Sequence, residues 1–114
     1  MEDDVAVRRM ALRVLERAGY VVEALADGRE ALERARSGEA SFDLLLSDVV
    51  MPQLSGPALA QELARTQPGL RVLYSGYLDD ALARVGLVVS EVDLLPKPYA
   101  PSSLLRRVRE VLDR

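Results

Sequence analysis

The 114-residue sequence contains no cysteine, no histidine and no tryptophan. Without cysteine there can be no disulfide framework and no thiolate metal site, and without histidine there is no imidazole for acid–base catalysis or zinc binding. No apolar run approaches the ~20 residues that a membrane-spanning helix needs. The chemistry of any functional site must therefore come from carboxylates, hydroxyls, lysine and arginine.

The overall composition is that of an ordinary globular protein. Hydrophobic residues make up 49% and charged residues 29% of the chain, and the length fits a single domain over residues 1–114. The formal charge of −3 gives no reason to expect nucleic-acid binding. Acids rather than a basic segment and an apolar core follow Met1, so we expect a cytoplasmic protein with no membrane association.

The chain is organised around the segment Phe42 to Gly56, which reads FDLLLSDVVMPQLSG. Its first residues form a short apolar run without helical spacing, and Pro52 and Gly56 then break the pattern. Such a run predicts a strand, Phe42 to Ser47, that is buried on both faces. Asp48 would then stand at the carboxyl end of this strand, where open α/β sheets place their functional groups.

Strand-like and helix-like segments alternate along the rest of the chain. Helical spacing or helix signals predict helices at Val5–Ala18, Arg29–Arg36, Gly56–Arg65, Asp79–Val85 and Pro101–Asp113, and short β-branched or apolar runs predict strands at Tyr20–Ala26, Phe42–Ser47, Leu70–Tyr74 and Val92–Leu95. This alternation predicts a parallel sheet with helices on both faces.

Several polar residues would meet at the carboxyl edge of that sheet. They are the acids Glu2 and Asp3, the strand-end Asp48, the hydroxyl of Ser75, and Lys97 between two prolines. Each alone has an ordinary structural explanation, as a helix cap, a solvated terminus or a turn. Their joint occurrence at the ends of successive strands favours one shared site.

Together these residues and the DLLLSDVVMPQLSG segment resemble the receiver domain of two-component response regulators. The resemblance covers nearly the whole chain and implies an α/β flavodoxin-like (CheY-like) fold, a doubly wound parallel sheet that has five strands in the family. It implies that Asp48 accepts a phosphoryl group from a kinase phosphohistidine, that Ser75 is the switch hydroxyl, and that Lys97 is the catalytic lysine. The expected partner is a sensor histidine kinase or a phosphotransfer domain.

The resemblance also implies a magnesium site. Glu2, Asp3 and Asp48 would supply carboxylates and Val50 a backbone carbonyl, which suits Mg²⁺ because this hard cation prefers oxygen ligands. The Lys97-Pro98 bond is expected to be cis, since cis peptide bonds are essentially confined to proline.

The sequence departs from the family pattern in three places. Receivers begin with an apolar strand before the acidic pair, in the middle of the sheet, and here that strand is reduced to Met1. A partner chain could fill the gap, the two flanking strands could close together, or the natural protein could carry further residues. The strand that ends at Ser75 is one residue shorter than usual, which could turn this side chain away. Leu94 stands where many receivers have an aromatic switch residue, so we expect no such switch.

Two other functions fit the same fold. One is a pseudo-receiver that docks or dimerises without being phosphorylated, which the truncated first strand favours. The other is a hydrolase that passes through an aspartyl-phosphate, which is disfavoured because Val50 stands where the comparable phosphatases carry a second aspartate.

A homodimer through the last two helices and the last strand would use the apolar Leu87 to Val89 and the face of the final helix, with its arginines at positions 106, 107, 109 and 114. That face could equally be solvated.

Overall fold

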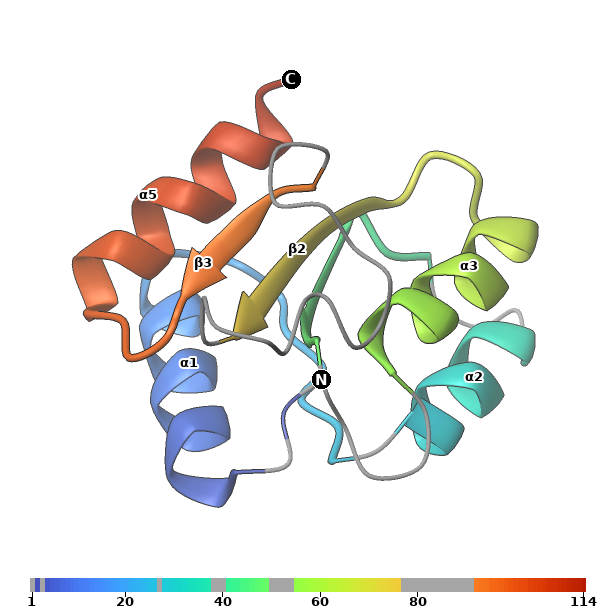
Figure 1. Ribbon diagram of the computed structural model, residues 1–114, viewed down its shortest axis with the longest axis horizontal. Helices are drawn as coiled ribbons and strands as arrows, with labels where there is room; N and C mark the ends of the chain where they lie inside the picture. The colour runs from blue at the N-terminus through green and yellow to red at the C-terminus, as the bar shows by residue number, and fades with distance from the viewer. Residues whose placement is uncertain (1, 3, 27, 38–40, 50–54, 77–91) are drawn as a thin grey trace.

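The computed structural model describes residues 2, 4–26, 28–37, 41–49, 55–76 and 92–114, and places helices on both sides of a parallel sheet (Figure 1). The strands are β1 (Leu44–Asp48), β2 (Arg71–Gly76) and β3 (Leu94–Pro96), and the helices are α1 (Val5–Arg17), α2 (Gly28–Arg36), α3 (Gly56–Thr66) and α5 (Pro101–Leu112). The strands lie side by side in the order β1, β2, β3, and both pairings are parallel. The predicted α/β class is confirmed.

Local signals in the sequence fix where the helices begin and end. Asp4 caps α1, with its side-chain oxygen accepting a hydrogen bond from the amide of Val7 at 3.1 Å, and Gly19 follows the helix with a φ of 99°. Ser55 caps α3 in the same way through the amide of Ala58. These caps satisfy amides that have no partner within the helix. The four described helices begin and end within one residue of their predicted bounds. The predicted helix Asp79–Val85 and the apolar residues Leu87–Val89 lie outside the described residues.

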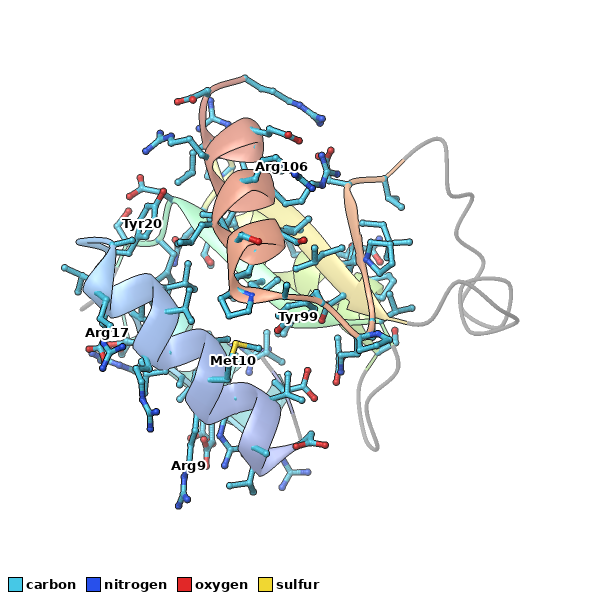
Figure 2. All side chains as sticks on the ribbon, turned by 90° about the vertical axis from the view of Figure 1, so that its left-hand side faces the viewer. Arg9, Met10, Arg17, Tyr20, Tyr99 and Arg106 are labelled. Atoms are coloured by element: carbon cyan, nitrogen blue, oxygen red, sulfur yellow. The ribbon has the colours of Figure 1, made fainter. Side chains whose placement is uncertain are left out.

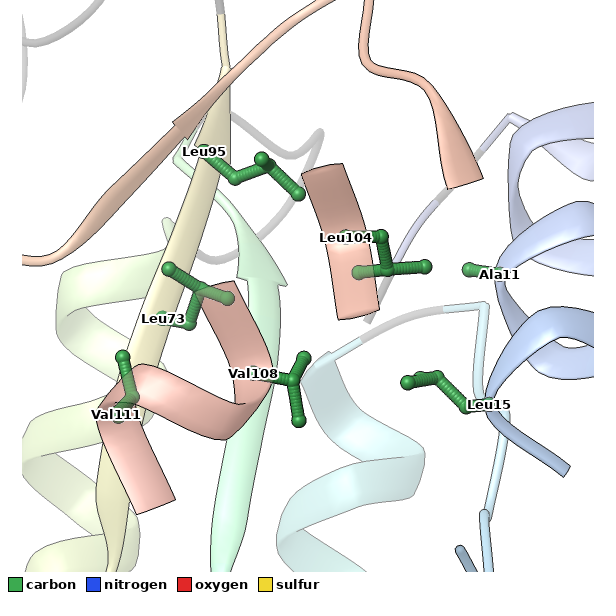
Figure 3. Packing of buried hydrophobic residues seen from close by; sticks show 7 residues of the cluster. All are labelled: Ala11, Leu15, Leu73, Leu95, Leu104, Val108 and Val111. Carbon is green, nitrogen blue, oxygen red and sulfur yellow. The ribbon is translucent and has the colours of Figure 1, made fainter. Parts of the chain in front are cut away.

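Side chains on opposite faces of the sheet enter different clusters. On one face, Leu73 and Leu95 pack against α1 and α5 in a cluster that Figure 3 shows from close by. On the other face, α2 and α3 bury Ala31, Leu59 and Leu63 against side chains that include Leu45. None of the helices in the described part of the chain is long and apolar enough to span a membrane.

The segment Tyr20–Ala26 was predicted as a strand, and this prediction is wrong. Its residues belong to neither a helix nor a strand, and the side chain of Val21 is fully exposed at 102%. A strand exists only where a neighbouring backbone completes its hydrogen-bond ladder. None of the strands in the described residues pairs with this segment.

A cavity of about 530 Å³ lies between this segment and β1. Residues 20–25 line one side and residues 41–46 the other, and the lining is mostly apolar. The cavity therefore separates residues 20–25 from β1, and these two segments have not closed together. The register of β1 explains the open edge: Asp43 and Val49 exchange backbone hydrogen bonds with β2, so alternate backbone groups, such as those of Leu44, point toward the cavity.

Candidate functional site

Asp48 is the last residue of β1, and its surroundings hold it firmly. The residue is only 5% exposed. The hydroxyl of Ser47, itself fully buried, donates a hydrogen bond to the Asp48 carbonyl at 2.9 Å. The amide of Gly56, at the start of α3, donates to the carbonyl of Val49 at 3.0 Å. The start of α3 is therefore tied to the residue that follows the end of β1.

Ser75 lies directly beside Asp48. The register of β1 and β2 pairs the two residues, and the Ser75 hydroxyl donates a hydrogen bond to Oδ1 of Asp48 at 3.2 Å. Ser75 is 2% exposed. The shorter strand therefore does not turn this hydroxyl to the other face, and the pair meets as expected for the carboxyl ends of neighbouring parallel strands.

Lys97 brings a positive charge to the same point. Its Nζ lies 2.6 Å from Oδ1 of Asp48 and 2.7 Å from Oε2 of Glu2, with all three side chains at least 88% buried. The Lys97 amide donates to the carbonyl of Gly76 at 2.9 Å, which ties the residue to the end of β2. The Lys97-Pro98 peptide bond is cis.

Glu2 is buried, although it lies next to the start of the chain. It is 7% exposed, and its Oε1 accepts a hydrogen bond from the amide of Asp4 at 3.1 Å. The structure thus brings together Glu2, Asp48, Ser75 and Lys97. Asp3 and Val50, the two other predicted magnesium ligands, lie outside the described residues.

The electrostatics of the site are dominated by burial and by two carboxylates that share one ammonium group. Burial, together with the neighbouring Glu2 side chain, raises the pKa of Asp48 from 3.8 to about 7 against the opposing effect of Lys97. Burial alone would lower the pKa of Lys97, but its hydrogen bonds to Asp48 and Glu2 raise it instead. Lys97 therefore stays charged at neutral pH, and the site has a surplus of carboxylate oxygens over positive charge.

These features fit a small, hard divalent cation. Two buried carboxylates on one ammonium leave negative charge uncompensated when both are ionised, and a cation with oxygen ligands would offset it. Within the described ranges, no group of three or more acidic, histidine or cysteine side chains converges on one point. The described residues can thus offer the carboxylates of Glu2 and Asp48, and a third acidic side chain could come only from outside them.

Sequence reasoning missed three residues that shape the site. Tyr99 follows the Lys97-Pro98 turn and lies beside the start of α5 (Figure 2); burial raises its pKa to about 12, with the charge of Glu2 adding to the rise. Gly56 leaves no room for a side chain, because a Cβ there would lie 2.2 Å from the Asp48 carbonyl oxygen. Arg8 donates to the backbone of Glu2. Of these three residues, only Tyr99 could have been found from the sequence, because it directly follows the Lys97-Pro98 turn.

Comparison with known proteins gives consistent results. The sequence model of the response regulator receiver domain matches residues 1–109. The chain is 39% identical to the sensor kinase CckA of Brucella abortus, matching 100% of this chain and 12% of that protein. It is 40% identical to the response regulator MprA of Mycolicibacterium vanbaalenii, over 100% of this chain and 49% of that protein. The chain thus spans half or less of the length of these relatives.

Solved structures show the same likeness in three dimensions. The receiver domain of the hybrid histidine kinase CckA superposes with a TM-score of 0.80 at 35% identity, over 97% of this chain and 94% of that one. The chemotaxis protein CheY4 of Vibrio cholerae gives a TM-score of 0.79 at 31% identity, over 96% and 92% of the two chains. The sequence match and these CheY-like neighbours agree with the site geometry, and the chain belongs to the response regulator receiver domain family.

Proposed function

We propose that this chain is the phosphoryl-accepting receiver of a two-component phosphorelay, with Asp48 as the acceptor. The observation that carries the proposal is the position of Lys97, whose Nζ lies 2.6 Å from Asp48 Oδ1 at the buried end of β1. An ammonium group held there can neutralise charge on an oxygen of an incoming phosphoryl group. Ser75, hydrogen-bonded to the same Oδ1 atom, provides a hydroxyl on the neighbouring strand.

The transfer step uses the Asp48 carboxylate as the nucleophile. A carboxylate oxygen forms a bond to phosphorus while the bond between phosphorus and the histidine nitrogen of the donor breaks, and the nitrogen keeps the electron pair. The product is an acyl phosphate on Asp48 and, once the released imidazole has taken up one proton from water, a neutral histidine on the donor. Since phosphoryl transfer depends mainly on positioning and on charge neutralisation, the role of the chain is to hold Asp48 and Lys97 in place. It is not a classical turnover enzyme.

Glu2 and Asp48 would hold Mg²⁺ in this proposal, together with Asp3 and the Val50 carbonyl that the family resemblance implies. When bound, the ion would supply positive charge next to the phosphoryl oxygens. The support from this chain is the carboxylate surplus around Lys97 and the burial of both described acids.

Phosphorylation would act on Ser75 as the switch residue. The phosphoryl group adds about −1.5 to −2 charge and strong hydrogen-bond acceptors. The Ser75 hydroxyl would then give up Oδ1 of Asp48 and donate to a phosphoryl oxygen, which resets the segments that follow β2 and β3. Leu94, at 8% exposed, offers no aromatic side chain to couple to this movement.

The names of the relatives support a histidine kinase or a phosphotransfer domain as the partner. Both the sensor kinase and the hybrid histidine kinase are kinase proteins by name. A homodimer through the face of α5 has less support. Arg107 pairs with Glu110 at 2.6 Å and with Asp93 at 3.6 Å, and Arg109 pairs with Asp113 at 2.8 Å, so these charges are already matched within the chain.

Mass spectrometry of the intact protein tests the acceptor role. After incubation with Mg²⁺ and a small phosphodonor such as acetyl phosphate, wild-type protein should gain the mass of one phosphoryl group. Asp48→Asn should gain none. The matched control is Asp43→Asn, which removes an acid just before β1 begins and should behave as wild type. No gain in wild type, or an equal gain in Asp48→Asn, contradicts the proposal.

The second candidate is a docking module that keeps the fold without being phosphorylated. The observation that favours it is the cavity of about 530 Å³ beside β1, which separates this strand from residues 20–25. In that case wild-type protein would take up no phosphoryl group in the same experiment, and gel filtration would show association that is independent of the phosphodonor.

A further inference from the structure

Glu2 is buried in the site, and the contacts of its main chain decide where its carboxylate lies. Its carboxylate contacts Lys97 and the amide of Asp4. Its own amide donates to the carbonyl of Leu25 at 3.4 Å, at the long limit of a hydrogen bond. The Leu25 segment is not part of the sheet. It is therefore a weak anchor for the main chain of Glu2.

Arg8 supplies a stronger anchor. Its Nη1 donates to the carbonyl oxygen of Glu2 at 2.9 Å, across six positions of the sequence. Arg8 belongs to the second turn of α1, whose start is fixed by the Asp4 cap. Its guanidinium thus reaches back past the helix start and holds the residue that precedes it. Hydrogen bonds from a charged donor are about twice as strong as neutral ones.

The next residue shows that this is not a general property of arginines on α1. Arg9 is exposed and points away from the body of the molecule (Figure 2). Arg8 is half-buried and lines the cavity beside β1 together with Glu2. Adjacent residues of the same type on one helix thus have different surroundings, which provides a matched pair for experiment.

We propose that Arg8 is a positioning residue that holds the Glu2 main chain so that its carboxylate lies at the Asp48–Lys97 site. Arg8 contacts neither Asp48 nor the atoms that would react, and it acts only through Glu2. The proposed magnesium site needs Glu2 in place before the ion arrives. This part of the inference rests on the proposed function, whereas the ordering of Glu2 does not.

The first measurement is made without metal. Arg8→Met removes the donor and keeps a long, helix-compatible side chain. By NMR relaxation, the order parameter of the Glu2 amide should fall from about 0.85 to below about 0.6. Arg9→Met removes the same charge from the exposed face and should leave it unchanged. Arg8→Lys keeps a charged donor and should restore part of the order. Equal order parameters in Arg8→Met and Arg9→Met overturn the proposal.

The second measurement is Mg²⁺ affinity, by titration with the metal alone. Arg8→Met should weaken binding about tenfold, the effect expected of a residue that orients a metal ligand. In a Glu2→Gln background the same substitution should have no further effect, because Arg8 acts through Glu2. Equal losses in both backgrounds overturn the proposal. Wild-type protein that binds no Mg²⁺ contradicts the proposed metal site instead, and the metal-free order parameters still decide the role of Arg8.

Discussion

Asp48 is costly to ionise in the folded protein, and this has a consequence for stability. Its pKa is about 7 in the fold, against an ordinary 3.8. Between these two values the folded state binds more protons than the unfolded state, so the free energy of unfolding falls as pH rises. Its contribution is greatest below about pH 4, decreases up to about pH 7 and is constant above that.

The first prediction follows from this pKa. With a metal chelator present, the free energy of unfolding of wild-type protein should decrease between pH 4.5 and 7.5 more steeply than that of Asp48→Asn. The two decreases should differ by roughly 4 kcal/mol at most. Urea denaturation at several pH values measures the difference. Asp43→Asn, which keeps the buried carboxyl, should retain the wild-type slope. A slope in Asp48→Asn that equals that of wild type would show that Asp48 is not the group responsible.

The second prediction concerns Gly56. A Cβ at this position would lie 2.2 Å from the Asp48 carbonyl oxygen and 3.1 Å from the Ser47 hydroxyl. Gly56→Ala must therefore push α3 away from the end of β1, at a cost of about 1–3 kcal/mol in unfolding free energy. Gly69→Ala meets nothing within 4 Å and should be neutral or stabilising by up to about 1 kcal/mol. Chemical denaturation of both variants makes the comparison, and equal effects would refute the steric explanation.

At the scale of elements, the third prediction contrasts β2 with the segment 20–25. β2 has a strand on each side, whereas residues 20–25 lie outside any strand or helix. Amides of Leu73 and Tyr74 should therefore exchange with deuterium far more slowly than those of Val22 and Ala24. Hydrogen exchange followed by NMR measures each amide. Comparable protection of the two sets would show that residues 20–25 are held by a ladder after all.

The sequence was sufficient for the four described helices because their apolar periodicity is a local signal. Asp4, Ser55 and Gly19 mark boundaries whatever the rest of the chain does. It was insufficient for Tyr20–Ala26, since a β-branched run shows what a strand needs from its own side chains but not whether a neighbour is present to complete the ladder. Tertiary context decided that segment.

The same division applies to the site. The sequence was sufficient to predict that Asp48, Ser75 and Lys97 meet, because the carboxyl ends of parallel strands lie at one edge of the sheet. The roles of Arg8 and Gly56 could not be predicted from the sequence. One depends on a side chain that reaches back to a carbonyl, and the other on the closeness of two backbones. Neither leaves a periodic trace in the sequence.

At the scale of the whole molecule, the cavity of about 530 Å³ leads to the fourth prediction. A mostly apolar cavity of this size should bind an environment-sensitive apolar dye such as ANS while the protein remains folded. Leu12→Glu places a charge on the cavity lining and should weaken dye binding. Val5→Glu alters an exposed apolar residue of the same helix, at 48%, and should leave binding unchanged. Fluorescence titration compares the variants, with circular dichroism to verify folding. Equal dye binding by both variants would contradict a dye-binding site in this cavity.

The cavity also divides the molecule into two parts of unequal attachment. Asp48 and Ser75 stand on paired strands. The main chain of Glu2 is joined instead to α1 and to residues 20–25, and only its carboxylate reaches Lys97. A fluctuation that separates α1 from α5 would carry the acidic end away while leaving the sheet intact. The Asp48 carboxylate would stay in place during such a partial opening, and the Glu2 carboxylate would leave the site. We therefore expect the position of Glu2 to depend on the packing of α1 against α5, and to be lost at temperatures at which the sheet is still folded.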